Sequence, residues 1–133
     1  MKLKKSPLAP EKFPILPSIR GVNIGTSASN SKYKRRQDIL TVTFDKPASV
    51  AGVFTLSQIP AAPVEFCKKN IVNGHANALI VNAGIANSFT GKKGTENNRL
   101  IANYFSKLIN SRQKDIYICS TGVIGEQLPV SKI

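Results

Sequence analysis

The sequence predicts an α/β domain, a layered sandwich in which helices pack on a mixed β-sheet. Short apolar runs bounded by polar turns lie at residues 78–81 and 115–119 and are typical of buried strands. Between them, residues 95–110 carry apolar side chains at helical spacing. The chain has 133 residues, of which 41% are hydrophobic, and this is enough for one core. Interleaved helices and strands make a layered architecture the most economical one.

We expect an extended lead-in at residues 1–18 and a folded part at residues 19–133. The lead-in contains four prolines, Pro7, Pro10, Pro14 and Pro17. Each proline removes a backbone donor and biases the preceding residue toward an extended conformation. The basic start is not followed by the apolar stretch of a signal peptide, and no stretch reaches the roughly 20 apolar residues that span a bilayer. The sequence therefore predicts a cytoplasmic protein with no membrane partner.

Three strands are predicted in the first half of the folded part. Residues 19–24 form a short strand, and the small residues at 25–30 form a loop after it. Residues 38–44 are rich in β-branched side chains that alternate with other residues, as in a strand. A third strand is expected at residues 49–54, with Asp45-Lys46-Pro47 as the hairpin turn between them.

The second half is predicted to alternate helices and strands. A first helix starts with Pro63 in its first turn and ends at Asn73-Gly74. The strand at 78–81 should be covered on both faces, since its apolar run is continuous. The helix at 95–110 has Lys107 near its end, where the macrodipole favours a cation. Its apolar face comprises Leu100, Ile101, Tyr104, Phe105, Leu108 and Ile109.

The chain is strongly basic, with 19 Lys and Arg against 7 Asp and Glu and a net charge of +12. Such a charge attracts nucleic acids, anionic membranes and acidic ligands without specific geometry. One basic run is present, Lys32–Arg36, and Tyr33 is its single aromatic residue. No aromatic RNA-binding pattern or helix-turn-helix spacing accompanies it. We interpret the run as a solvated loop, with nucleic-acid binding as the weaker alternative.

The sequence predicts neither a metal site nor a disulfide. Cys67 and Cys119 are far apart and have no further cysteine or histidine at metal-ligand spacing, so we expect two buried thiols. His75, the single histidine, follows Asn73-Gly74 in a predicted loop and is interpreted as a surface residue, with a catalytic base as the alternative. The acidic residues are scattered and indicate no catalytic triad or carboxylate pair.

Two polar segments follow the buried strands, where α/β folds often place chemistry. Residues 82–91 end in a Gly-Lys-Lys that invites comparison with a phosphate-binding loop. The spacing is wrong, and Lys93 stands where that motif needs Ser or Thr. We interpret the segment as a turn whose Asn and Gly residues are left-handed, with direct ligand contact as the alternative.

The second segment, Ser120-Thr121-Gly122, follows the strand at 115–119. It can present a hydroxyl and a glycine amide to one point, which would suit an oxyanion hole for acyl transfer. A simple turn at the end of a strand is the alternative. Physical reasoning from the residues leaves both interpretations open.

Five segments follow one another along the chain: Gly21-Val22 after Phe13-Pro14, and residues 51–55, 61–64, 81–91 and 120–129. Together they resemble the bifunctional ornithine acetyltransferase / N-acetylglutamate synthase family of arginine biosynthesis. The resemblance runs from about Leu8 to Ile133. The fold it implies is the N-terminal portion of the ornithine acetyltransferase sandwich.

This resemblance implies an acyltransferase that moves an acetyl group from N-acetylornithine to glutamate. Some family members also accept acetyl-CoA as donor, and none needs a metal or bound cofactor. The family's precursor cleaves itself before a threonine into α and β chains, which assemble as a hetero-oligomer. The freed threonine is the nucleophile, with its own amine as the neighbouring base. The family's oxyanion hole maps onto Thr121 and Gly122.

The chain also departs from the family pattern. Ala83 and Ile85 replace a serine and an asparagine of the family's usual segment. The family's substrate lysine, cleavage segment and nucleophilic threonine are expected beyond Ile133, so we predict no nucleophile and assign no substrate-binding residue here. The chain is therefore expected to be the N-terminal part of an α chain and inactive alone. The alternatives are a remnant acting as a binding or assembly module, and a nucleic-acid binder centred on Lys32–Arg36.

Overall fold

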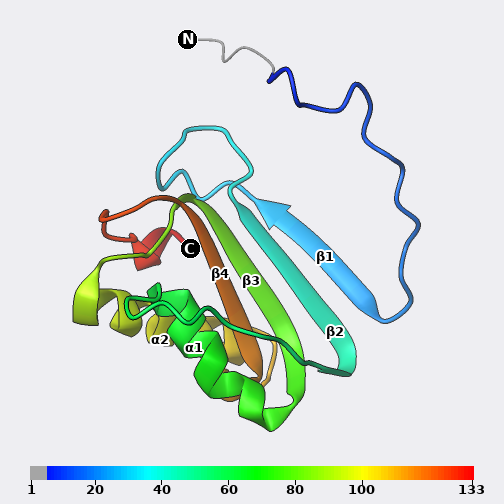
Figure 1. Ribbon diagram of the computed structural model, residues 1–133. Helices are drawn as coiled ribbons and strands as arrows, with labels where there is room; N and C mark the ends of the chain where they lie inside the picture. Colours follow the sequence, from blue (N-terminus) through cyan, green and yellow to red (C-terminus); the bar gives the residue numbers. More distant parts are fainter. Residues whose placement is uncertain (1–5) are drawn as a thin grey trace.

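The computed structural model describes residues 6–133 and contains a four-stranded sheet and two α-helices (Figure 1). The strands are β1 (Val22–Ser27), β2 (Ile39–Ser49), β3 (His75–Ile85) and β4 (Ile116–Val123). The helices are α1 (Ala62–Asn70) and α2 (Gly91–Leu108). The strand order is β1-β2-β3-β4, with β3 and β4 parallel and the other two pairs antiparallel. This mixed sheet confirms the predicted α/β class.

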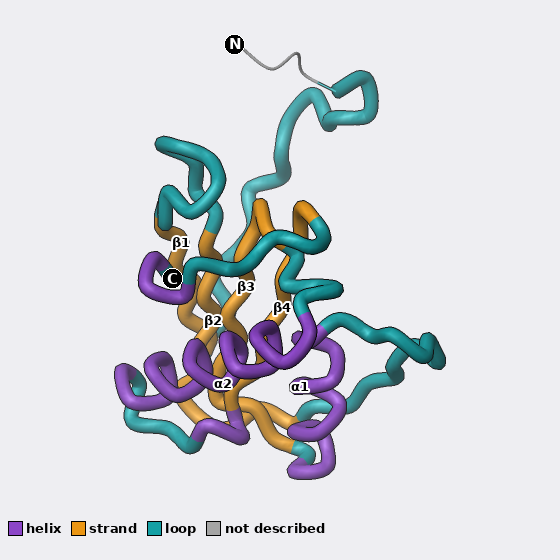
Figure 2. Tube along the Cα trace, turned by 90° about the vertical axis from the view of Figure 1, so that its left-hand side faces the viewer, coloured by secondary structure: helices purple, strands orange, loops and turns teal. Residues whose placement is uncertain are grey.

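One side of the sheet carries both helices (Figure 2). We call this side the helix face, and its buried strand residues include Ala78, Ile80, Ile116 and Ile118. Helix α2 packs Ile101 and Ala102 into the same cluster. These six residues are at most 5% exposed, so removing their apolar surface from water is a main source of stability.

Helix α1 lies along the outer edge of β4. The Cys67 thiol donates to the Ile118 carbonyl (3.3 Å), and the Ile118 amide donates to the same sulfur (3.5 Å). The Asn70 side-chain amide donates to the Ile116 carbonyl (3.3 Å). The helix therefore satisfies backbone groups that an edge strand would otherwise expose. Burial raises the pKa of the Cys67 thiol, which keeps it protonated as this contact requires.

The opposite side, which we call the open face, bears no helix and comprises Leu40, Val42, Leu79, Val81, Tyr117 and Cys119. The segment after β2 covers part of it through Val50 and Phe54, and α1 reaches its β4 edge through Cys67, which packs in one cluster with Tyr117. The prediction that the strand at 78–81 is covered on both faces was therefore wrong, because Leu79 and Val81 are only half-buried. Cys119 is exposed, which corrects the expectation of two buried thiols.

The first strands differ from the prediction. β1 starts at Val22, later than expected, and extends to Ser27 in the predicted loop. Residues 45–47 form no hairpin turn, because β2 continues through them to Ser49. The register of β2 against β3 shifts between Thr43 and Ala48, where Pro47 cannot donate to a ladder. Residues 50–57 form no strand.

The helices agree better with the prediction. α1 is followed by a 3-10 turn, Ile71–Asn73, and Gly74 ends it in a left-handed conformation (φ +67°). α2 begins four residues earlier than expected and ends at Leu108. Part of its predicted apolar face is not buried, since Tyr104 is 59% and Leu108 82% exposed. Residues 6–18 contain no helix or strand, while the division at residue 18 stays a prediction.

Candidate functional site

The parallel strands β3 and β4 end side by side at one end of the sheet. Their register pairs Ala83 with Thr121 and Gly84 with Gly122. Both glycines have positive φ angles, +113° and +129°. A side chain at Gly122 would overlap the backbone of Gly84, so this close approach requires glycine. Residues 120–122 therefore belong to the end of β4. The interpretation of this motif as a simple turn was wrong.

Thr121 and Gly122 are both exposed. Side chains alternate along a strand, which places Thr121 on the open face in line with Tyr117 and Cys119. Gly122 follows Thr121 directly in the chain, and its φ of +129° departs from that of a regular strand. A ligand at this strand end can meet both the hydroxyl and the amide.

The segment after β3 is a turn stabilised from inside. Asn87 has φ +48° and is fully buried. Its side-chain amide donates to the Gly94 carbonyl (3.1 Å) and to Asn98 Oδ1 (2.8 Å), while its own Oδ1 accepts from the Thr90 hydroxyl (3.0 Å). The left-handed turn interpretation holds for residues 86–91, where Asn87 and Gly91 have positive φ angles, but residues 82–85 belong to β3. The Asn87 amide is used within the fold.

The two residues that differ from the family's usual segment, Ala83 and Ile85, lie in different surroundings. Ala83 is in β3 directly opposite Thr121 and is half-buried. Ile85 is 4% exposed and belongs to the core cluster of the helix face. The polar side chain expected at position 85 is thus replaced by an apolar contact in the core.

The basic run lies in the loop between β1 and β2, residues 28–38, which we call the basic loop. Lys34, Arg35 and Arg36 are exposed, as predicted for a solvated loop. Lys32 instead lies 2.5 Å from a Glu126 carboxylate oxygen. Buried Asp38 accepts hydrogen bonds from Ser29 and Ser31.

The electrostatics of Asp38 follow from these contacts. Burial by itself raises the pKa of this carboxyl, but the hydrogen bonds from Ser29 and Ser31 outweigh burial, and the net pKa is lowered. Asp38 is therefore ionised at neutral pH and holds the base of the basic loop.

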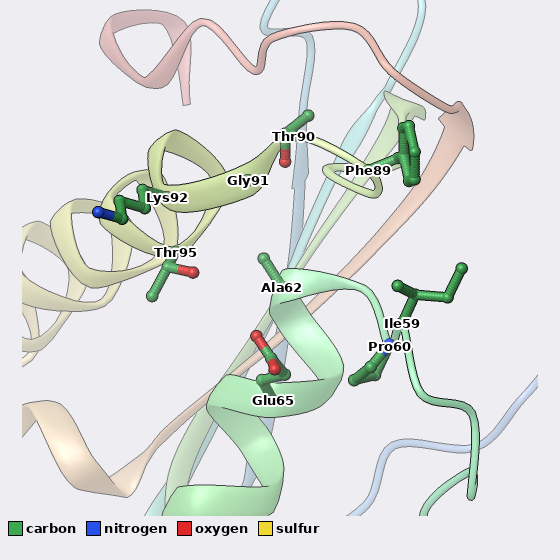
Figure 3. Close-up of a pocket in the computed structure, with 9 residues that line it drawn as sticks. All are labelled: Ile59, Pro60, Ala62, Glu65, Phe89, Thr90, Gly91, Lys92 and Thr95. Atoms are coloured by element: carbon green, nitrogen blue, oxygen red, sulfur yellow. The ribbon is translucent and has the colours of Figure 1, made fainter.

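Sequence reasoning missed a cleft of about 510 Å³ between the N-terminal ends of α1 and α2 (Figure 3). Ile59, Pro60 and Phe89 form its apolar side. Glu65 and Thr95 point into the gap from the two helices (Figure 3). Only the tertiary structure joins these segments, and the one local signal is Phe89, whose φ of +58° is unusual for a bulky residue.

The other candidate residues of the sequence analysis do not form a site. His75 is exposed at the first position of β3. Within residues 6–133, no three His, Cys, Asp or Glu side chains gather as metal ligands would. No helix in this part of the chain combines the length and the apolar character needed to cross a bilayer.

Comparison with known proteins gives consistent matches. The profile of the ArgJ family matches residues 23–133. An "arginine biosynthesis bifunctional protein ArgJ" of Rhizobium meliloti is 50% identical over 96% of this chain and 31% of its own length. The protein of the same name from Agrobacterium fabrum is 49% identical over 99% of this chain and 32% of its own length. The chain thus spans about a third of these relatives.

Two solved structures share the fold. The ArgJ protein of Bacillus halodurans matches with a TM-score of 0.80 and 33% identity, over 85% of this chain and 59% of that one. The ornithine acetyltransferase of Mycobacterium tuberculosis, solved with ornithine, matches with a TM-score of 0.75 and 31% identity, over 85% and 62%. On the profile match and the identities together, the chain belongs to the ArgJ family.

Proposed function

We propose that this chain contributes to an acetyltransferase of arginine biosynthesis that moves an acetyl group from N-acetylornithine to glutamate. The names of its relatives support this reaction, since they are arginine biosynthesis proteins and an ornithine acetyltransferase. The observation that carries the proposal is the exposed pair Thr121 and Gly122 at the end of two parallel strands. We assign this pair as the oxyanion hole.

The chemistry needs two donors at one point. When a nucleophile attacks the acetyl carbonyl, the carbonyl oxygen becomes negative, and the Thr121 hydroxyl and Gly122 amide stabilise it. Collapse of this intermediate breaks the bond to the ornithine nitrogen, which leaves with a proton, and the acetyl group stays on the nucleophile. The glutamate amine then takes the acetyl group. We place the nucleophilic threonine in a partner β chain rather than in these 133 residues, and acetyl-CoA as an alternative donor.

A chimera tests the proposal. Residues 1–133 replace the matching third of the Rhizobium meliloti protein, and acetyl transfer from N-acetylornithine to glutamate is measured. Thr121→Ala should lower kcat by about 10²–10³-fold with a smaller change in KM, because oxyanion donors act mainly in the transition state. Thr121→Ser keeps the hydroxyl and should retain most of the rate. An unchanged kcat in Thr121→Ala would refute the assignment.

A second candidate function is an assembly module without catalysis. The open face favours it, because Leu40, Val42 and Val81 form an apolar surface that residues 6–133 cover only in part. A chimera that assembles and folds but transfers no acetyl group would support this second function. An active chimera would favour the enzyme.

A further inference from the structure

The two cysteines of the chain meet where helix α1 packs against the edge of β4. The sulfur of Cys67 lies 3.3 Å from the Ile118 carbonyl oxygen and 3.5 Å from the Ile118 nitrogen. Cys119 is the next residue of β4, and consecutive residues are only about 3.8 Å apart along the Cα trace. The sequence predicted no disulfide, because the two residues lie far apart along the chain. The fold makes them neighbours, and both are free thiols.

Both cysteines line the same small cavity, which has a volume of about 230 Å³. Its walls also include Phe54, Pro63 and Val64, and none of the residues that line it is charged. Side chains move between staggered rotamers where they have room. The cavity therefore allows the two sulfur atoms to turn toward each other without first displacing another side chain.

The two thiols differ in how easily a solute reaches them. Cys119 is exposed, whereas Cys67 is 9% exposed. Burial raises the pKa of the Cys67 thiol, and the negative charge of an ionised Cys119 raises it further. Partial burial also raises the pKa of Cys119. Such thiols ionise little at neutral pH, so the pair responds to sustained oxidising conditions and does not act as a fast catalytic thiol.

We propose that Cys67 and Cys119 are an oxidation site, at which a small-molecule disulfide closes an intramolecular disulfide bond that slows acetyl transfer. The Cys119 thiolate attacks the oxidant and forms a mixed disulfide, which releases one small thiol. The Cys67 sulfur then attacks the Cys119 sulfur, and the second small thiol leaves. Two electrons pass from the cysteines to the oxidant, and the two cysteine protons end on the two released thiols.

The bond would reach the proposed oxyanion hole through the backbone of β4. A disulfide sulfur has no proton, so the Ile118 carbonyl would lose the donor that Cys67 provides. Ser120 lines the same cavity, and its buried hydroxyl has no hydrogen-bond partner within residues 6–133. Drawing Cys119 toward α1 therefore shifts the strand end that carries Thr121, and oxyanion donors act only when they are preorganised. This link to catalysis rests on the proposed function.

The first experiment uses the 133-residue chain, which contains no cysteine besides Cys67 and Cys119. The chain is equilibrated with mixtures of reduced and oxidised glutathione, and free thiols are then alkylated and counted by mass spectrometry. In oxidising mixtures, the product should be monomeric, have no free thiol and give a cross-linked peptide with both cysteines. Two free thiols in every mixture would refute the proposal, and so would disulfides that join two chains.

Two variants are the matched controls, and circular dichroism establishes that each one folds. Cys67→Ala keeps the exposed thiol without its partner and should stop at a mixed disulfide of Cys119 with glutathione. Cys119→Ala keeps the buried thiol, which should stay unmodified because glutathione does not reach it. If the original chain also stops at the mixed disulfide, Cys119 reacts alone and the paired site is wrong.

The second experiment measures acetyl transfer by the chimera before and after oxidation. Oxidation should lower kcat by at least about tenfold, because small displacements of a catalytic group are costly in rate, and dithiothreitol should restore it. The Cys119→Ala chimera cannot form the bond and should keep its rate, which controls for cysteines in the Rhizobium meliloti part. An oxidised chimera with an unchanged kcat would overturn the link to catalysis. An inactive reduced chimera would instead refute the proposed function, while the thiol count of the 133-residue chain decides the oxidation site in either case.

Discussion

The two faces of the sheet differ in how completely they are buried. On the helix face, Ala78, Ile80, Ile116 and Ile118 are at most 5% exposed. On the open face, Leu79 and Val81 are half-buried, Tyr117 is buried beside α1, and Cys119 and Thr121 are exposed. The difference teaches that the helix face supplies most of the buried apolar surface. The open face keeps part of its surface accessible to other molecules.

The largest expected effect is on the helix face. Ile116→Ala removes a fully buried side chain and should lower the free energy of unfolding by about 2–5 kcal/mol through lost burial and a residual cavity. Val42→Ala on the open face removes a half-buried side chain and should cost much less. Urea unfolding of both variants measures the difference. An equal loss of unfolding free energy in the two variants would show that the two faces contribute equally to stability.

An intermediate effect is expected in the polar network beneath α2. Asn87→Ala removes the donor to Gly94 and Asn98 and the acceptor for Thr90. The free energy of unfolding should fall by about 1–3 kcal/mol, because buried partners are left without a hydrogen bond. Thr121→Ala, at an exposed position, should change it by no more than about 0.5 kcal/mol. A larger loss for Thr121 would give that residue a structural role.

The smallest effect concerns Asp38, at the base of the basic loop. Its pKa is lowered from the ordinary value of 3.8, so the ionised form is more favourable in the folded than in the unfolded chain. The resulting stability is present above about pH 4–5 and is lost as pH falls through 3.8 to the lower folded value. In Asp38→Asn, the free energy of unfolding should fall less steeply as the pH is lowered over this range, and urea unfolding at a series of pH values measures it. If the variant and the original chain lose the same stability at low pH, other carboxyl groups cause that loss.

Local patterns predicted most of the second half of the fold. The run predicted at residues 78–81 lies inside β3, and all of the run predicted at 115–119 except Asp115 lies inside β4. Helix α1 has Pro63 in its first turn, as expected. The same patterns failed around Pro47, because a proline in a long strand can mark a bulge as well as a turn. They also failed for Cys119, since burial depends on what covers a strand rather than on the residue itself.

The candidate site was only partly predictable. The Ser-Thr-Gly motif pointed to Thr121 and Gly122, but the cleft between α1 and α2 joins residues about 30 positions apart, and no local pattern records that proximity. Lys32 similarly shows no sign in the sequence of its contact with Glu126, because the two are separated by 94 positions.

The sequence by itself determined the α/β class, the family and the chemical character of the strand end, because periodicity and short motifs are local properties of the chain. Only the tertiary structure decided the close pairing of Gly84 with Gly122 and the placement of the basic loop beside it. It also decided which sheet face stays open. These features depend on register and packing between distant segments, and such contacts are set by the free energy of the whole fold rather than by any one segment.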